Sequence, residues 1–473
     1  MKGSQNETPA FHYHPPRTDR VIERVRKRNV QQNETTSAQN STETTIPAET
    51  LDVSELDNGG KIFTILACNE DVRYTYIEDV EQTGDAMDDA IYLRNRKVEK
   101  HLGISLKIVD TSTETARTDI YTPLSRDVMS GDAQYDMISP HILQSISQLV
   151  TENMVVDLSH INYVDFTKSW WNGDFTDTLN LNGKLFYASG DMIVPNARVI
   201  VFNKRMMEDY KLPDIYEVIN SGAWTLDKLG EYTKDITHDA DGNGIMDKND
   251  IYAFSDLANT GLATSFIHGS NQLFVTKVKN GFDIQLGSEK MYNITTKLHD
   301  YIYKDGNTAI TNVEFGNGKV LFGSQVLLKL QILRDYDTDF GIIPFPKYDE
   351  SQEKYQSSVW NGLVCVPVTA KDYSLSGAVL ETMAYYSQST LMPAYYDKLL
   401  DSKFVRDDES AAMLDLIFDG LVYDIGLCFD NFIGCYGAPG KLLNEGSTDL
   451  ASFYEKNKSM YEEHYAELFD AVK

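Results

Sequence analysis

The stretch that decides the fold is Lys61-Ile-Phe-Thr-Ile-Leu-Ala67, a short apolar run typical of a strand covered on both faces. The residues after it predict a helix over 88–102, with an apolar stripe and Gly103 as its stop, and then a strand over 104–109. A helical stretch over 116–129 and a strand over 135–139 complete a βαβαβ pattern. This pattern predicts a parallel sheet whose strands are joined by right-handed crossovers.

A second set of elements follows further along the chain. The sequence predicts a strand over 198–202 and a helix that begins at Thr225, followed by strands over 319–322, 340–343 and 359–366, helices beyond Ser374 and a closing helix over 451–473. Two α/β lobes connected by several crossings account for this order. Because ligands of open parallel sheets bind beyond the carboxyl ends of the strands, we expect the binding site between the lobes.

The composition limits the class of protein. At 473 residues the chain is long enough for two or three domains, and 42% of it is hydrophobic. A net charge of −28 argues against nucleic acid as a partner. The sequence contains no run of about 18 apolar residues, so we expect contact with a membrane only through a tether or a membrane protein. The N-terminus has no apolar signal region, and an export signal is therefore expected to be absent from this chain.

Residues 1–60 are expected to form a disordered tether. The part over 31–50 consists almost entirely of Gln, Asn, Glu, Thr, Ser and Ala and is too polar to bury a core. A basic segment over 17–28 precedes it, and we interpret that segment as a solvated tail.

The segment over 239–250 reads as a calcium loop of the EF-hand type. Oxygen-bearing side chains occupy loop positions 1, 3, 5, 9 and 12, in order Asp239, Asp241, Asn243, Asp247 and Asp250. Gly244 stands at position 6, where the loop turns sharply, and the carbonyl of Ile245 serves position 7. The alternative is a turn rich in Asp, Asn and Gly that binds no ion. A single loop with Asp rather than Glu at its end predicts a structural Ca²⁺ rather than a signalling site.

Four cysteines are too few for a disulfide scaffold in a chain of this length. Cys68 and Cys365 lie in apolar strands and are expected to be buried free thiols. Cys428 and Cys435 are close enough in sequence to bridge in an exported protein, although free thiols are favoured. The sequence does not decide between the two.

Several segments form a family resemblance by their order: Tyr135-Asp-Met-Ile-Ser-Pro-His141, Leu181-Asn-Gly-Lys-Leu-Phe-Tyr187, Arg198-Val-Ile-Val-Phe-Asn-Lys204, Ala223-Trp-Thr-Leu-Asp-Lys-Leu229, Phe315-Gly-Asn-Gly-Lys-Val-Leu-Phe322 and Phe340-Gly-Ile-Ile-Pro-Phe-Pro346. The set resembles the extracellular solute-binding proteins of ABC sugar importers, of the maltose-binding kind. The blocks Pro393-Ala-Tyr-Tyr-Asp397 and Arg406-Asp-Asp-Glu-Ser-Ala-Ala-Met-Leu414 resemble the longer-chain subgroup, and the calcium loop is similar to that of alginate-binding members. The resemblance covers about residues 60–440.

This resemblance implies an α/β, two-lobed fold of the periplasmic-binding-protein kind, with parallel-sheet lobes joined by several hinge crossovers. The expected first lobe is 61–188 plus 325–369, and the second is 189–324 plus 370–450, with a C-terminal helix over 451–473. The implied function is to capture an oligosaccharide and deliver it to the transmembrane subunits of an ABC permease. The implied location is the outer face of the cell membrane, with the protein held there as a lipoprotein and acting as a monomer.

A sugar site needs aromatic faces together with carboxylates and amides. By resemblance, Trp360 falls where the family's strand returns past the cleft. Its ring either stacks on a sugar or packs in the core. The pair Trp170 and Trp171 lies in a loop, and one of them, Trp171, is expected to line the cleft because adjacent positions of an extended segment cannot both be buried on one side. Trp224, beside a helix start, is expected in the core.

Three polar residues complete the predicted sugar site. Asp191 lies where the chain first crosses between the lobes by resemblance, and is a predicted hydroxyl acceptor. Asp89 opens a helix, where an acidic residue either binds ligand or simply stabilises the helix terminus. His268 is also a candidate, although isolated histidines are more often ordinary polar residues.

The sequence lacks the common motifs of enzymes. It contains no G-x-S-x-G, no Walker glycine loop, no H-E-x-x-H and no Rossmann glycine triplet, so we do not expect an enzyme. Two alternatives stay open at this point. One is a glycoside hydrolase with paired carboxylates, and the other, less favoured, is a dockerin-like calcium-dependent adhesion protein, which would need a duplicated loop.

Overall fold

The computed structural model describes residues 49–68, 76–111, 119–143, 146–255, 260–306, 308–309, 315–400, 408–430 and 433–473. These residues all belong to one compact unit over 47–473. Residues 1–48 of the expected tether, with the basic segment, lie outside the described residues, as does the start of the block at Arg406.

The first sheet has the predicted parallel topology. Its strands are β1 (Lys61–Ala67), β2 (Ile104–Asp110) and β3 (Met137–Ser139), in the order β2-β1-β3, and β1 is parallel to both neighbours. Helix α2 (Ala86–Leu102) connects β1 to β2 and ends at Gly103 in a left-handed conformation, as its sequence predicts. Helix α3 (Tyr121–Ser130) connects β2 to β3.

The second sheet has five strands in the order β10-β4-β9-β5-β8, with the bounds β4 (Arg198–Asn203), β5 (Tyr252–Ser255), β8 (Thr308–Ala309), β9 (Val320–Val326) and β10 (Phe340–Ile343). Strand β5 is parallel to β9 and β8, whereas β4 is antiparallel to β9 and β10. The sheet is therefore mixed.

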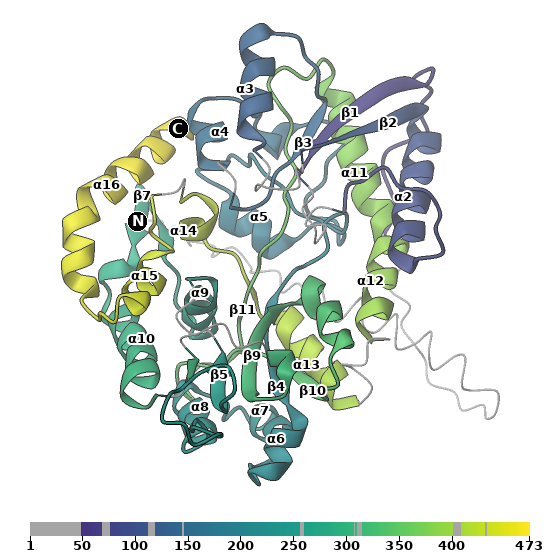
Figure 1. Cartoon of the computed structure of the whole chain (residues 1–473). Coiled ribbons are helices and arrows are strands. Elements are labelled where there is room, and N and C mark those ends of the chain that lie inside the picture. Colours follow the sequence, from purple (N-terminus) through teal and green to yellow (C-terminus); the bar gives the residue numbers. More distant parts are fainter. Residues whose placement is uncertain are drawn as a thin grey trace, which may run out of the picture. The chain divides into compact units, whose positions relative to one another are not determined.

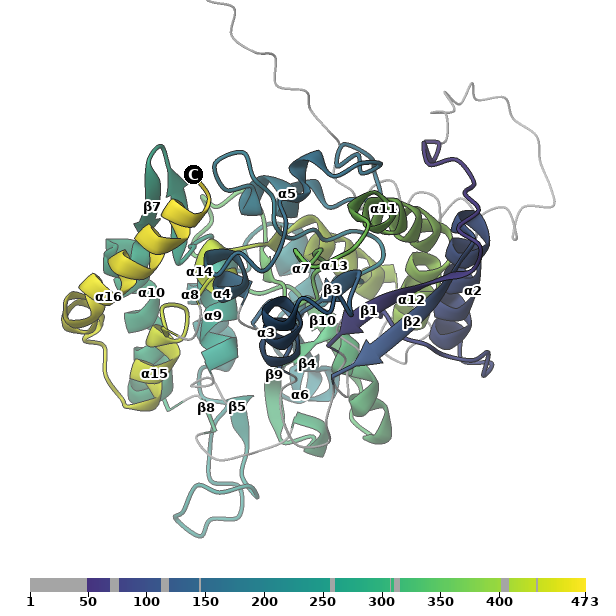
Figure 2. The ribbon, with the colours of Figure 1, turned by 90° about the horizontal axis from the view of Figure 1, so that it is seen from above.

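Helices surround both sheets: α4 (Ile146–Thr151), α5 (Gly173–Leu179), α6 (Lys204–Asp209), α7 (Ile215–Asn220), α8 (Leu226–Thr233), α9 (Thr260–Gly269), α10 (Glu289–His299), α11 (Tyr373–Ser389), α12 (Leu391–Leu400), α13 (Asp408–Asp419), α14 (Ile425–Cys428), α15 (Ala438–Asn444) and α16 (Leu450–Ala471). Short strands form two further pairs, β6 (Val275–Val278) with β7 (Gly281–Ile284) and β11 (Ser357–Ser358) with β12 (Leu421–Val422). Helix α16 runs beside β7 (Figures 1 and 2).

The division of the chain between the lobes differs from the expected one. Strand β10, expected in the first lobe, pairs with β4 in the five-stranded sheet. Helix α11, expected in the second lobe, packs beside α2 against the first sheet (Figures 1 and 2). The reason is burial: Leu375, Val379 and Met383 of α11 share a core with Phe63 and Ile65 of β1. Hereafter the first lobe means the elements around β2-β1-β3, α11 included, and the second lobe those around the five-stranded sheet.

The expected boundary of the tether at residue 60 is also too late. Val53 is buried in the core of the first lobe, with Leu51 and Leu56 packed against the same core. The backbone carbonyl of Val53 lies 2.9 Å from Nε2 of His101 at the end of α2. Residues 49–60 therefore belong to the folded body, because their few apolar side chains have a place to be buried.

Two smaller predictions are confirmed. Trp224 is fully buried and its indole N–H donates to the carbonyl of Pro344 at 3.1 Å. The cysteines Cys68, Cys365, Cys428 and Cys435 are all buried and free, so Cys428 and Cys435 do not form a disulfide.

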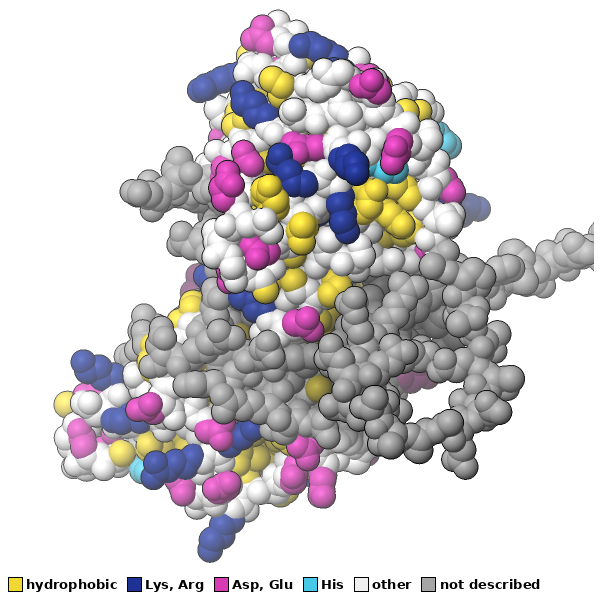
Figure 3. Space-filling view, turned by 90° about the vertical axis from the view of Figure 1, so that its right-hand side faces the viewer, with side chains coloured by type: hydrophobic (Ala, Val, Ile, Leu, Met, Phe, Trp, Pro, Cys, Tyr) yellow, Lys and Arg dark blue, Asp and Glu magenta, His cyan; other side chains and the backbone are white. Residues whose placement is uncertain are grey.

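Over the side of the molecule shown in Figure 3, basic and acidic side chains are interspersed on the upper part.

Candidate functional site

Two extended segments lie side by side where the lobes join. The segment over 357–366 forms single bridges with the segment over 188–197, at Ala188 with Val364 and at Ala197 with Val359. The same segment bridges to Ile138 through Cys365. The predicted strand over 359–366 is thus an extended crossing held by isolated bridges, while the regular strand is the short β11. This crossing connects the first sheet to β4 of the second.

Trp360 lies on this crossing and is half-buried. Its backbone N–H donates to the carbonyl of Asn196 at 3.1 Å, and the side-chain amide of Asn196 donates to the carbonyl of Trp360 at 3.1 Å. The guanidinium carbon of Arg198, the first residue of β4, lies 5.2 Å from the centre of the Trp360 ring, within range of a cation–π contact. The indole is therefore fixed by backbone pairing and by a cation over its ring.

Behind Trp360 a chain of hydrogen bonds leads into the interior. The indole N–H of Trp360 donates to Oγ of Ser358 at 3.0 Å, and the same oxygen lies 3.0 Å from Nδ1 of His268. Nε2 of His268 lies 3.0 Å from Oδ2 of Asp424. Ser358, His268 and Asp424 are each 0% exposed. His268 was predicted to touch ligand directly. In the structure it is buried, and Ser358 lies between its ring and the indole of Trp360, because α9 packs against β11.

Asp424 anchors this chain of bonds. As the N-cap of α14 it accepts the backbone N–H of Gly426 at 2.6 Å. It also accepts the backbone N–H groups of Phe274 at 2.6 Å and Val275 at 3.3 Å, at the start of β6. Four donors from three parts of the chain thus hold one buried carboxylate.

Trp170 and Trp171 are both buried, which corrects the expectation that one of them lines a cleft. The two indole N–H groups donate to the two carboxylate oxygens of Glu381 in α11, at 2.9 and 2.8 Å. The expectation assumed an extended segment, but residues 166–170 form turns, so both rings point to the same side. Burial raises the pKa of Glu381 to about 7, although the bonds from the two indoles and from the N–H of Asp165 oppose this rise.

Asp191 and Asp89 are the remaining predicted ligand residues. Asp191 is fully buried, and its backbone N–H donates to the carbonyl of Trp170 at 2.8 Å, so it lies beside the tryptophan pair. Asp89 is half-buried in the first turn of α2, where its carboxylate accepts the backbone N–H groups of Thr83 and Gly84 at 3.1 and 3.2 Å. These bonds tie the segment before α2 to the first turn of the helix. The structure brings Asp191 close to Trp171, and it links Trp360 to His268.

The predicted calcium loop brings three carboxylates together. One oxygen from each of Asp239, Asp241 and Asp250 lies within 4.8 Å of the others. Asp239 accepts the backbone N–H groups of Gly242 and Gly244, both at 2.7 Å, and the bond from Gly244 is the main reason why its pKa lies below the usual range. Both glycines have the positive φ that such a tight turn needs, 71° and 80°.

The other loop residues face their own backbone. The side-chain carbonyl of Asn243 accepts the N–H of Ile245 at 2.7 Å, and Asp247 accepts the N–H of Asn249 at 2.7 Å. Asp250 is buried at the base of the loop and accepts the N–H groups of Ala240 and Asp247. Three convergent carboxylates are the oxygen donors that a hard divalent cation requires, so the donor set fits Ca²⁺.

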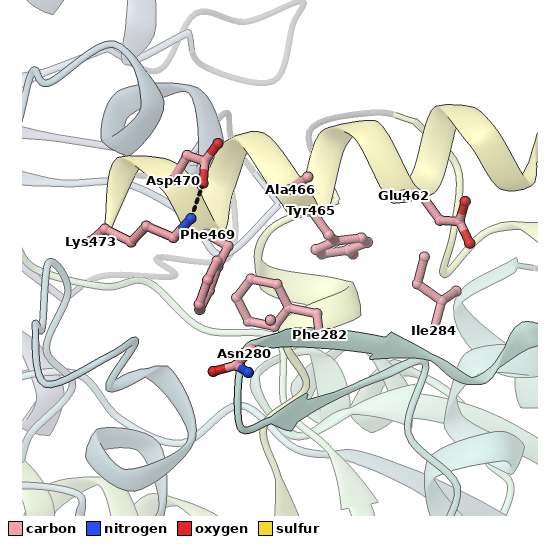
Figure 4. A pocket seen from close by; sticks show the side chains of 10 residues that line it. Asn280, Phe282, Ile284, Glu462, Tyr465, Ala466, Phe469, Asp470 and Lys473 are labelled. Atoms are coloured by element: carbon pink, nitrogen blue, oxygen red, sulfur yellow. Dashed lines mark hydrogen bonds and ion pairs between the residues drawn. The ribbon is translucent and has the colours of Figure 1, made fainter.

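A separate cavity of about 590 Å³ lies between β7 and α16. Figure 4 shows Phe282 of β7 facing Tyr465 and Phe469 of α16, with ring centres 5.6 and 6.2 Å from that of Phe282. Lys473 pairs with Asp470 at 2.5 Å, and its ammonium lies 4.8 Å from the centre of the Phe469 ring. None of the residues predicted to bind sugar or metal lines this cavity.

Sequence reasoning missed Ser358, Asp424 and Glu381. Ser358 stands two residues before Trp360, and in a strand residues i and i+2 share a face, which was the one local signal for their contact. Asp424 and Glu381 are isolated acidic residues in apolar surroundings, and no motif marks either of them.

The solved structures that resemble this chain agree on its fold. No family model matches the chain, and no curated protein matches its sequence. An ABC substrate-binding protein from Listeria monocytogenes, solved with cycloalternan, is similar in structure with a TM-score of 0.56 and 13% identity, over 85% of this chain and 99% of that one. A cyclo/maltodextrin-binding protein with maltotetraose has a TM-score of 0.57 and 13% identity, over 88% and 98% of the two chains. A galacto-N-biose-/lacto-N-biose I-binding protein of Bifidobacterium longum has a TM-score of 0.55 and 12% identity, over 87% of this chain and 99% of that one.

The chain therefore has the two-lobed fold of the solute-binding proteins. That confirms the fold class predicted from the sequence. Among the helices that the structure describes, none is both long and apolar enough to cross a membrane.

Proposed function

We propose that this protein is the extracellular substrate-binding component of an ABC importer, which captures an oligosaccharide between its lobes and delivers it to the transmembrane subunits of a permease. The observation that carries the proposal is Trp360, a half-buried indole on the crossing between the two sheets. The fold around it is shared with proteins solved in complex with cycloalternan, maltotetraose and lacto-N-biose.

The surroundings of Trp360 have the chemistry of a sugar site. An indole ring has two faces, and Arg198 lies over one of them. A pyranose would stack its C–H-rich side on the other face. Capture between two lobes joined by extended crossings would then proceed by hinge closure, in which the ligand favours the closed state. In this role the protein is no enzyme and acts as a tethered monomer outside the cell.

Ca²⁺ has a structural role in this proposal. The carboxylates of Asp239, Asp241 and Asp250 would hold it, with the position of Asp250 at the buried base of the loop tying the ion to the second lobe. A cation there would offset the repulsion between three carboxylates that lie within 4.8 Å of one another.

Binding of maltotetraose, cycloalternan and lacto-N-biose to the purified chain, measured by titration calorimetry, tests the proposed function. Trp360→Ala should weaken binding at least about five-fold, because ring stacking contributes roughly 1 kcal/mol or more. Tyr292→Ala, which removes an exposed aromatic ring from α10, is the matched control and should leave the affinity unchanged.

Two further measurements separate transport from hydrolysis. Small-angle scattering should give a smaller radius of gyration with ligand, as hinge closure requires. Chromatography should recover the oligosaccharide unaltered after incubation. Cleaved sugar would favour the glycoside hydrolase instead, and failure of every oligosaccharide in the set to bind would contradict the proposed ligand class.

A further inference from the structure

We propose that Ser358, His268 and Asp424 are positioning residues of the sugar site, because they form a hydrogen-bond chain that runs in one direction and fixes the indole of Trp360. The proposal rests on the assignment of Trp360 to that site. The links are 3.0 Å from Trp360 to Ser358, 3.0 Å from Ser358 to His268 and 3.0 Å from His268 to Asp424. Of these four side chains only Trp360 is partly exposed, so a ligand would contact only the Trp360 end of the hydrogen-bond chain.

The chemistry of the four side chains sets the direction of the bonds. An indole N–H can only donate, so Oγ of Ser358 accepts from Trp360. The carboxylate of Asp424 can only accept, so Nε2 of His268 is the nitrogen that donates; in the neutral imidazole Nδ1 is then the acceptor, and it takes the single proton of the Ser358 hydroxyl. Nε2 of His268 carries the hydrogen and donates it to Asp424. The structure thus assigns the Nε2–H tautomer to His268.

The far end of the chain is rigid. Asp424 accepts the backbone N–H groups of Phe274, Val275 and Gly426 in addition to His268, so its carboxylate cannot rotate without losing bonds. His268 also packs edge-on against Phe274, with ring centres 5.6 Å apart. A fixed carboxylate orients the imidazole, the imidazole orients the hydroxyl, and the hydroxyl sets the angle at which the indole faces the crossing.

Serine, histidine and aspartate are also the residues of hydrolase triads. A nucleophile must reach its substrate, however, and Ser358 is 0% exposed. Its hydroxyl is engaged by Trp360 on one side and by His268 on the other. The geometry therefore points to positioning of the indole rather than to attack on a substrate.

The first measurement needs no sugar, and His268→Gln serves only to assign the signals of His268 among those of the nine histidines. Selective ¹⁵N labelling of histidine in the full chain should give His268 signals of the neutral Nε2–H tautomer, with Nδ1 in the range of an unprotonated nitrogen. A protonated Nδ1 in the folded protein would overturn the direction of the chain and with it the proposal.

The second measurement compares two adjacent serines by the indole signals of ¹⁵N-tryptophan-labelled protein, with Trp360→Phe used to assign the signal of Trp360. Ser358→Ala removes the acceptor and should shift that signal, and Ser358→Thr, which keeps the hydroxyl, should restore it. Ser357→Ala is the matched control: Ser357 lies on the same strand and is equally buried, and the structure gives its hydroxyl no hydrogen bond. Equal effects of Ser358→Ala and Ser357→Ala on the signal would overturn the proposal.

The third measurement links the chain of bonds to binding, with maltotetraose as the probe. Ser358→Ala should weaken its affinity about five-fold, since a hydrogen bond contributes about 1 kcal/mol, while Ser357→Ala should not. A shifted indole signal together with an unchanged affinity would overturn the positioning role. If the wild-type chain binds no maltotetraose although both NMR results hold, the choice of sugar fails and the hydrogen-bond chain stands.

Discussion

Two groups of carboxylates in this protein are satisfied in opposite ways. In the loop over 239–250 the acceptors take N–H groups from within the loop, as Asp239 does from Gly242 and Gly244. Glu381 and Asp424 instead take donors from distant parts of the chain. The indoles bound to Glu381 are 211 and 210 positions away, and His268 is 156 positions from Asp424.

This difference decides what a substitution should cost. In the exposed loop, water can replace a lost carboxylate as the partner of a backbone N–H. In the interior no such replacement is at hand, and each stranded donor costs about 1–3 kcal/mol. The buried carboxylates Glu381 and Asp424 should therefore dominate stability, and Asp239 and Asp241, the loop carboxylates that water reaches, should matter only through a bound cation.

Asp424→Ala is expected to have the largest effect, a loss of roughly 4 kcal/mol or more in the free energy of unfolding. It leaves the imidazole N–H of His268 and three backbone N–H groups without an acceptor at once. Urea denaturation followed by circular dichroism measures the loss.

The control for this prediction is Asp214→Ala. Asp214 is also an N-cap, of α7, and accepts from Tyr216 and Glu217, but it is exposed and its partners are local. It should cost about 1 kcal/mol. Equal losses from the two variants would remove the contrast between local and distant donors.

Glu381 is expected to make stability depend on pH. Its pKa in the folded protein is about 7, raised from 4.5, so the folded state holds the proton more tightly than the unfolded chain. The stability that this proton provides is complete below pH 4.5 and is lost as the pH rises through 7. The loss should reach about 3 kcal/mol.

Urea unfolding at pH 5, 6, 7 and 8 tests this, with Glu381→Gln as the comparison because it cannot ionise. Burial raises the pKa of Asp430 to about 6, so its own contribution to stability is lost mainly below pH 7. Asp430 is present in both proteins, and its contribution cancels in the difference between them. The difference between wild type and Glu381→Gln should therefore change most between pH 5 and 7 and level off towards pH 8. A difference that is constant with pH would show that Glu381 does not titrate in this range.

The same contrast explains what the sequence could predict. The βαβαβ order of the first lobe, the cap at Gly103 and the turn at Gly244 depend on residues that are close in sequence, and each was predicted correctly. The hydrogen-bond chain from Trp360 to Asp424 combines three segments that are far apart in sequence and meet only in the folded protein. Periodicity and motifs carry no information about such meetings.

The errors have the same origin. Residues 49–60 look too polar for a core, yet Val53 finds one formed by β1 and α11. Trp170 and Trp171 were judged from an extended segment, whereas a turn and a carboxylate 211 and 210 positions away bury both indoles. In each case a distant element supplied the partner that the local sequence lacks.

The calcium loop should give the smallest effect of the three. Extracellular calcium modules have Kd values of about 10⁻⁴–10⁻³ M, so about 1 mM Ca²⁺ should stabilise the folded protein by only about 1 kcal/mol. We expect EDTA to lower the melting temperature slightly, measured by calorimetry, and Asp239→Ala to abolish this response because it removes one of three converging carboxylates. Asp132→Ala, at an exposed acidic residue outside the loop, should respond to EDTA as wild type does. An unchanged melt of the wild-type protein in EDTA would leave the loop as an ion-free turn, in which backbone N–H groups alone hold the acidic side chains in place.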